Sequence, residues 1–360
     1  MERYLGLDAH GQSCTFGVMG PSGRKLRHDV VETNGAALVE YLKGLTGRKH
    51  LCLEEGTQSA WLYEIFSPHV EEIVVAGINE KSRGPKSDVL DAFQRAEEIR
   101  TNRVTTPVFK APRRFSNLRE LSRVHTMLVR DVVRVQSRLK VMYRARGIPS
   151  PGKTVYSPRR REEWLAKLPV SCRLATARLY EVYDALVKLK NAAEKEMVAE
   201  AAKQPIAKVL ATVPGLGPIR VAQLLPVVVT PHRFRTRKQF WAYCGLAIVQ
   251  RSSSDWVRTE HGGWVRARVS KTRGLNRNHN SRMKDVFKGA ATTVLISYPN
   301  DPLHEHYQRL TASGTKPNLA KLTLARRIAA VTLRMWKDGK EYNPETLRTK
   351  QQEEIASPAR

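Results

Sequence analysis

The sequence predicts an α/β domain of about one hundred residues at the N-terminus, joined to a larger, mainly helical remainder. Short β-type segments alternate with helical runs up to residue 100, and long amphipathic helices follow. The charge changes at the same place: residues 1–100 hold 12 basic and 15 acidic residues, whereas the other 260 hold 50 and 19. The whole chain carries +28. This excess favours a polyphosphate partner over an anionic membrane, because the basic residues are spread through folded-looking segments.

The N-terminal domain is predicted to have the element order βββαβαβα. Gly20-Pro21-Ser22-Gly23 is a strong turn signal between two strands, and Asn34 is a suitable N-cap for the first helix. The expected strands are residues 4–8, 13–19, 25–32, 50–54 and 71–77, and the expected helices are 34–43, 58–66 and 88–100. Three strands in a meander followed by alternating helices and strands predict a mixed sheet.

Four acidic residues occupy positions where this domain would gather them. Asp8 and Glu54 end two strands, and Asp88 and Asp91 lie three residues apart at the start of the last helix. Strand ends of an α/β sheet face a common crevice, and an i, i+3 pair of aspartates shares one helix face. Glu55 is adjacent to Glu54, but the alternation of Leu51 and Leu53 places Glu54 with Cys52 on the other face. Clustered carboxylates repel unless a cation lies between them, so the pattern indicates a divalent metal site.

Each of these acids also has an ordinary structural explanation. Both aspartates suit the first turn of a helix, where the helix dipole favours negative charge. Asp8 could be a polar strand terminus, and Glu54 could face solvent. The combination of element order and four acids favours the metal site over these separate explanations.

A linker and a long helical hairpin are expected in residues 105–205. Residues 118–146 contain no proline and no internal glycine before Gly147, and their apolar residues recur at intervals of three and four. Prolines and glycines break this helix at 147–157, and residues 162–168 and 173–201 are helical again. The periodicity suits both a helical bundle with a solvated basic face and a coiled coil that dimerises and contacts nucleic acid.

The segment Pro214-Gly215-Leu216-Gly217-Pro218-Ile219-Arg220 predicts a tight connection between two helices. One interpretation is a turn that needs glycine for positive φ. The other is an element of the helix-hairpin-helix kind, in which backbone amides approach a phosphate. Gly215, Gly217 and Arg220 are therefore candidate nucleic-acid contacts.

Residues 231–290 hold 14 basic and 3 acidic residues, and three consecutive serines lie among them. Three serines in a row are by default a polar loop. In a field this positive, however, a serine hydroxyl near a metal could attack a phosphate. Arg251, Lys271 and Arg273 are the basic residues around this segment that we expect to contact nucleic acid.

Residues 4–100 resemble a RuvC-type ribonuclease H-like domain. The segments Gly6-Leu7-Asp8, Leu53-Glu54-Glu55-Gly56-Thr57 and Lys86-Ser87-Asp88-Val89-Leu90-Asp91-Ala92 resemble those of the DEDD transposases of insertion sequences. The C-terminal part is similar to the same family in Gly245-Leu246, the serine run, His261-Gly262-Gly263 and the Lys271–Asn276 turn. The chain departs from the family pattern at Ile248, where proline is usual, and at Ser254, where glycine is common.

The resemblance implies Mg²⁺-dependent DNA strand chemistry in which Asp8, Glu54, Asp88 and Asp91 bind the metal and a serine forms a covalent link to DNA. Counting from Gly245 favours Ser253, with Ser252 and Ser254 as alternatives. The resemblance also implies donor and target DNA, a structured non-coding guide RNA, a dimer or tetramer with active sites shared between subunits, and a bacterial, nucleoid-associated setting. The residues alone leave open a structure-selective nuclease that uses metal-activated water, and an inactive nucleic-acid binder.

The remaining features complete the expected organisation. The four cysteines, Cys14, Cys52, Cys172 and Cys244, show no metal-ligand spacing and favour a reduced, cytosolic setting without disulfides or zinc. No long apolar run suggests secretion or a membrane span. The predicted domains are residues 1–104, 105–205, 206–340 with a helix-hairpin-helix-like element and a short basic helix at 326–336, and a polar tail at 341–360.

Overall fold

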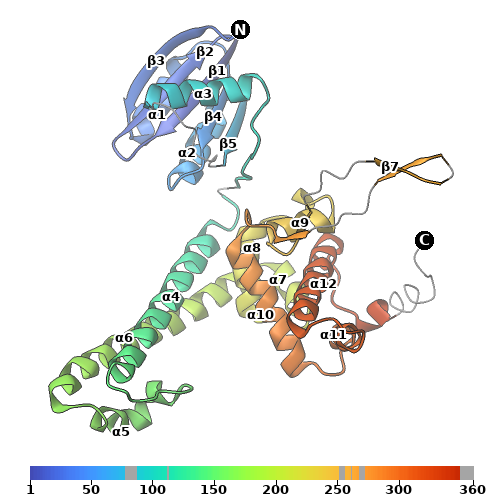
Figure 1. Ribbon diagram of the computed structural model, residues 1–360. Coiled ribbons are helices and arrows are strands. Elements are labelled where there is room, and N and C mark those ends of the chain that lie inside the picture. Colours follow the sequence, from blue (N-terminus) through green and yellow to red (C-terminus); the bar gives the residue numbers. More distant parts are fainter. Residues whose placement is uncertain (78–86, 112, 251–255, 261, 267–271, 349–360) are drawn as a thin grey trace. The chain divides into compact units, whose positions relative to one another are not determined.

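The chain forms two compact units, Met1–Arg114 and Phe115–Arg360. The computed structural model describes residues 1–77, 87–111, 113–250, 256–260, 262–266 and 272–348. Figure 1 labels the helices and most of the strands of both units.

The first unit contains a mixed five-stranded sheet, and the predicted element order is confirmed. Its elements are β1 (Glu2–Ala9), β2 (Ser13–Met19), β3 (Lys25–Glu32), α1 (Gly35–Gly44), β4 (Arg48–Glu54), α2 (Ser59–Phe66), the 3₁₀ turn η1 (Ser67–His69), β5 (Glu72–Ala76) and α3 (Asp88–Arg100). The strand order is β3-β2-β1-β4-β5, with β2 antiparallel to β1 and β3, and with β1, β4 and β5 parallel. This sheet is compatible with a ribonuclease H-like domain.

Side-chain alternation along β1 assigns one face of the sheet to each helical layer. Leu5 and Leu7 pack into a core with Leu38 of α1 and Leu62 of α2. Tyr4 and Gly6 point the other way, toward α3, which crosses β1, β2 and β4 on that face (Figure 1). The next side chain on the α3 face is that of Asp8.

Gly6 sets how closely α3 approaches the sheet. A Cβ atom at this position would lie 1.8 Å from the carbonyl oxygen of Ala92 and 2.5 Å from the amide nitrogen of Ala96. Because both atoms belong to the helix backbone, no rotamer change could make room for a side chain. The closeness of α3 to β1 therefore depends on a missing side chain.

The second unit begins with an antiparallel helical hairpin. Its elements are α4 (Ser116–Arg144), the 3₁₀ turns η2 (Thr154–Tyr156) and η3 (Pro158–Arg160), α5 (Arg161–Ala166) and α6 (Val170–Ala202). The hydroxyl groups of Tyr143 on α4 and Tyr180 on α6 lie 2.9 Å apart, and Tyr180 donates to the carbonyl oxygen of Val155 at 2.8 Å. These hydrogen bonds link α4, α6 and the connection between them at the end of the hairpin where the chain turns back. The predicted apolar stripe of α4 is buried or partly buried except at Val124, which is 47% exposed.

The rest of the second unit is mainly helical, with short strands. Its elements are α7 (Pro205–Ala211), α8 (Gly217–Val228), η4 (Pro231–Arg233), α9 (Arg237–Tyr243), β6 (Ile248–Gln250), β7 (Trp256–Arg258), β8 (Trp264–Arg266), β9 (Thr272–Leu275), α10 (Ser281–Ser297), α11 (Pro302–Ala312) and α12 (Pro317–Asp338). Strand β6 pairs with β9, and β7 pairs with β8, both antiparallel.

The last helix, α12, is longer than expected. The sequence predicted a short helix at 326–336, but the helix begins at Pro317, a residue that suits the first helical position because its φ is already fixed and its missing N–H is not needed there. Leu324 and Ile328 are fully buried and share a core with Phe287 of α10 and Leu225 of α8. The helix is thus part of the central core of the second unit.

Candidate functional site

Three predicted metal ligands lie on the side of the first sheet that α3 covers. Asp8 lies near the end of β1, and Asp88 and Asp91 lie in the first turn of α3. The helix begins at Asp88 because the Ser87 hydroxyl accepts a hydrogen bond from the amide of Leu90 at 3.2 Å. The close packing at Gly6 and this helix start bring the acids from two distant parts of the chain together.

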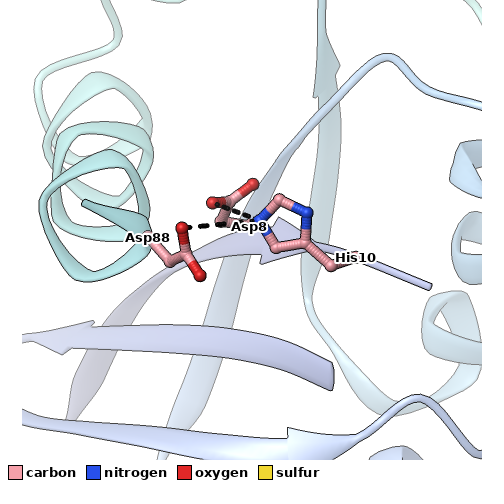
Figure 2. Close-up of side chains that lie close together, drawn as sticks. All are labelled: Asp8, His10 and Asp88. Atoms are coloured by element: carbon pink, nitrogen blue, oxygen red, sulfur yellow. Dashed lines mark hydrogen bonds and ion pairs between the residues drawn. The ribbon is translucent and has the colours of Figure 1, made fainter. Parts of the chain in front are cut away.

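Asp8, His10 and Asp88 form a compact group of possible ligands (Figure 2). Nε2 of His10 lies 3.2 Å from Oδ2 of Asp8 and 3.5 Å from Oδ1 of Asp88. One ligand atom from each residue lies within 4.8 Å of the other two. Two carboxylate oxygens and an imidazole nitrogen fit a divalent cation, and the oxygens are the donors that Mg²⁺ prefers. The Asp8 side chain is 21% exposed and that of Asp88 is 59% exposed, so the group is open to solvent on one side.

The electrostatics of Asp8 indicate that its negative charge lacks full compensation. Burial raises the pKa of Asp8, and the nearby carboxylates of Asp88 and Asp91 raise it further, whereas His10 lowers it. Asp91 lies in the same helix turn as Asp88, but the compact group of ligand atoms does not include it. A bound cation would relieve both the repulsion and the cost of burial.

Glu54 ends β4 on the α3 side of the sheet, as the alternation along that strand predicted. Its carboxylate accepts a hydrogen bond from Arg95 of α3 at 2.8 Å, and Arg95 also donates to Glu98 at 2.7 Å. The neighbouring Glu55 instead pairs with Lys110 at 2.5 Å. The structure therefore places Glu54 beside α3 but gives it a cationic partner, and its place in a four-acid metal site stays a prediction.

His10 and Arg95 are the two residues of this region that the sequence reasoning missed. His10 is two positions beyond Asp8, the spacing at which side chains share one side of an extended segment, and this signal could have identified it. Arg95 is four residues after Asp91 on the same helix, but only the tertiary structure shows that it is buried and bound to Glu54. The two carboxylates that it binds more than offset the cost of burial and raise its pKa, so Arg95 remains charged.

The Gly215-Leu216-Gly217 connection joins α7 to α8, and its residues have distinct roles. Gly215 has φ +82°, and a Cβ there would lie 2.4 Å from the carbonyl oxygen of Ala290 on α10. Gly217 also has positive φ but open space around its missing side chain. Arg220 donates to the carbonyl oxygen of Gly215 at 2.6 Å and to the hydroxyl of Thr293 at 3.1 Å. These bonds direct Arg220 toward its own protein, and contact of the three residues with nucleic acid stays a prediction.

The serine segment and most of its basic neighbours lie outside the described residues. These are Arg251, Ser252, Ser253, Ser254 and Lys271. Arg273 lies on β9, with its side chain outside the described part of the structure. Gly245, which precedes this segment, has φ +65° and packs against the ring of His279 so closely that a Cβ would lie 2.3 Å from its Cδ2 atom.

The strand pair β7–β8 lies on either side of Gly262 and Gly263, which the resemblance singled out. Trp256 pairs with Arg266, and Arg258 pairs with Trp264, in an antiparallel register. Both tryptophans are highly exposed, at 60% and 64%. Among the described residues, no helix is both long enough and apolar enough to cross a membrane.

Comparison with known protein families gives two matches that together cover most of the chain. Residues 5–144 match a family model for IS110-type DEDD transposases, and residues 207–308 match the model described as the transposase IS116/IS110/IS902 family. A comparison with curated proteins finds no match. The first family match contains Asp8, Glu54, Asp88 and Asp91, and the second contains the serine run and the Gly-Leu-Gly connection. The chain therefore belongs to the IS110 family of DEDD transposases.

Proposed function

We propose that this DNA transposase cleaves and exchanges DNA strands in a Mg²⁺-dependent reaction that passes through a covalent serine–DNA phosphoester. The observation that carries the proposal is the group of Asp8, His10 and Asp88 at the start of α3, in a chain of a DNA-processing family. The four-acid set of Asp8, Glu54, Asp88 and Asp91 remains the proposed metal site, with His10 beside it.

Asp8 and Asp88 would hold the cation through one carboxylate oxygen each, and Asp91 adds negative charge within reach. When bound, Mg²⁺ neutralises phosphate charge and stabilises the negative charge that develops on the reacting oxygens. Arg95 holds the Glu54 carboxylate at 2.8 Å and so fixes its position beside α3. His10, with Nε2 at 3.2 Å from Asp8, would offer an imidazole nitrogen to the same cation.

The proposed nucleophile is Ser253, with Ser252 and Ser254 as alternatives. Its Oγ loses a proton and forms a bond to phosphorus, the scissile P–O bond breaks, and the leaving sugar oxygen takes up a proton. Joining to the second DNA strand reverses these changes, so no external energy source is needed. The basic surroundings of the serines in the sequence support a phosphate substrate.

The proposal is tested by trapping the full-length protein on end-labelled DNA in Mg²⁺ and mapping the linked residue by mass spectrometry. The expected result is a covalent adduct on a serine between 252 and 254, which Ser253→Ala abolishes. Asp8→Asn should also lose the adduct, whereas Ser171→Ala on the helical hairpin should retain it. Cleavage by Ser253→Ala at the rate of the unmodified protein, without an adduct at any serine, would replace this proposal with a nuclease that uses metal-activated water.

A structured guide RNA and a dimer or tetramer are further parts of the proposal. Apolar side chains on the outer surface of the helical hairpin support self-association: Val133 and Val141 of α4 and Leu174 of α6 are 53%, 57% and 69% exposed. Sedimentation of the purified protein and sequencing of co-purified RNA test the two parts separately. A monomer over a wide concentration range, or protein that cleaves DNA fully after RNase treatment and repurification, would remove the corresponding part.

A further inference from the structure

The second unit contains a basic pocket that none of the predicted site residues occupies. It is an open cavity of about 450 Å³, bounded by α4, the end of α8, the end of α9 and the start of α10. The residues that matter for its chemistry are Arg119, Arg123, Arg130, His279, Asn280 and Arg282. None of its described lining residues is acidic.

Four arginines from two distant segments share this pocket. Arg119, Arg123 and Arg130 come from α4, and Arg282 comes from the first turn of α10. Burial lowers the pKa of Arg282, and the positive charges of Arg130 and Arg123 lower it further. A guanidinium does not lose its proton at neutral pH, so these side chains repel one another. Glu120 on α4 pairs with Arg123 at 3.0 Å and offsets part of this repulsion. An anion that entered the pocket would relieve the rest.

One arginine of the pocket, Arg282, is hydrogen-bonded to the opposite helix, and further polar groups lie beside it. A guanidinium nitrogen of Arg282 lies 3.4 Å from the hydroxyl of Ser122, a residue 160 positions away in the chain, to which it donates. The side chain of Asn280 caps α10 by accepting from the amide of Met283, so the positive end of a 17-residue helix faces this region. Nδ1 of His279 is buried without a hydrogen-bond partner among the described residues. Such an atom at a cavity wall is available to a ligand or water.

We infer that this pocket binds the backbone phosphates of the DNA substrate, an inference that rests on the proposed function for the identity of the polymer. Planar guanidinium groups recognise phosphate oxygens through paired hydrogen bonds. Arg119 and Arg130 are eleven positions apart, so at 1.5 Å per residue their Cα atoms are separated by about 16 Å along α4. A single free phosphate would contact only part of this line of arginines on α4. A DNA strand, which carries one charge about every 3.4 Å along the helix axis, matches the length of the line.

The test measures the binding of full-length protein to a fluorescein-labelled 20-base-pair duplex in EDTA, over a series of salt concentrations. Arg130→Gln and the double variant Arg123→Gln/Arg130→Gln alter exposed side chains and should preserve the fold, as circular dichroism would verify. Each lost phosphate contact should reduce the slope of log Kd against log salt concentration by about 0.9. The double variant should also bind about tenfold more weakly at 0.1 M salt. Arg178→Gln on α6, where Arg178 pairs with Glu181, is the matched control.

The outcomes separate this pocket from the proposed reaction. A double variant with the salt slope and Kd of Arg178→Gln would overturn the inference. The inference would also be overturned if the double variant lost affinity only for a structured RNA assayed in the same way. It would be overturned as well if inorganic phosphate at equal charge concentration displaced the duplex from the unmodified protein. Since EDTA prevents metal-dependent chemistry, the expected salt slopes would support phosphate binding by the pocket even if the serine–DNA adduct were never found. Conversely, an adduct formed normally by the double variant at low salt would leave the proposed reaction standing.

Discussion

Gly6→Ala should displace α3 from the sheet and so disturb the metal site without changing any proposed ligand. The added Cβ would lie 1.8 Å from the carbonyl oxygen of Ala92. Carbon and oxygen atoms do not approach closer than about 3.0 Å in such contacts, so helix and strand must separate by at least about 1.2 Å, the difference between the two distances. Overpacking of this kind costs about 1–3 kcal/mol of folding free energy.

The displacement acts on catalysis because α3 carries Asp88 and Asp91, whereas Asp8 stays on β1. A shift of about 1 Å in a catalytic group can reduce the rate about 100-fold. We therefore expect Gly6→Ala to bind Mg²⁺ and Mn²⁺ at least about tenfold more weakly and to cleave DNA about 100-fold more slowly. Isothermal titration calorimetry measures the binding, and a labelled-duplex assay measures the cleavage.

Gly11→Ala is the matched control for this experiment. Gly11 follows Asp8 by three residues, but a Cβ at this position would meet no atom within 4 Å. This variant should bind metal and unfold in urea like the unmodified protein. If Gly6→Ala matched Gly11→Ala in metal affinity, in cleavage and in urea midpoint, then the close packing of α3 on β1 would not position the acids.

Three further predictions concern titrating groups of the first unit. Because folding raises the pKa of Asp8, its ionised carboxylate destabilises the fold above that pKa. In differential scanning calorimetry at pH 7, Asp8→Asn should therefore raise the melting temperature in EDTA and should remove the stabilisation by added metal. A lower melting temperature of Asp8→Asn in EDTA would contradict this. His10→Gln should weaken the binding of Mn²⁺ more than that of Mg²⁺, since imidazole nitrogen suits transition metals better, and equal losses in calorimetric titrations would refute a ligand role. The pKa of His50 is raised because its hydrogen bonds to Glu72 and Glu2 outweigh the effect of burial. The stabilisation by His50 is therefore complete below about pH 6.5 and is lost as the pH rises through the raised pKa. The urea midpoint of His50→Gln should lack this pH dependence, and a pH profile equal to that of the unmodified protein would contradict the prediction.

The order of elements in the first unit could be predicted from the sequence because it depends on local signals. The turn at Pro21 and the N-cap at Asn34 mark element boundaries, and both are present in the structure. The two-residue period of strands also fixed which face each side chain occupies. That period placed Glu54, and not Glu55, on the side that α3 covers.

Other features depend on contacts between segments far apart in the chain, which no local pattern encodes. The pairing of Glu54 with Arg95 requires α3 to lie against β4, and it joins residues 41 positions apart. Similarly, the length of α12 could not be judged from its basic, amphipathic end alone, because the helix is stabilised by packing against α10 and α11.

The sequence by itself determined that this protein has a near-neutral α/β unit, a long helical hairpin and a basic helical unit, since periodicity, turn chemistry and charge are properties of neighbouring residues. Only the tertiary structure decided that His10 joins Asp8 and Asp88, that Arg220 binds its own loop, and that arginines of α4 and α10 line one pocket. The physical reason is distance along the chain. Hydrogen bonds and charge interactions act over a few ångströms, so partners such as Ser122 and Arg282 meet only after the helices between them have packed.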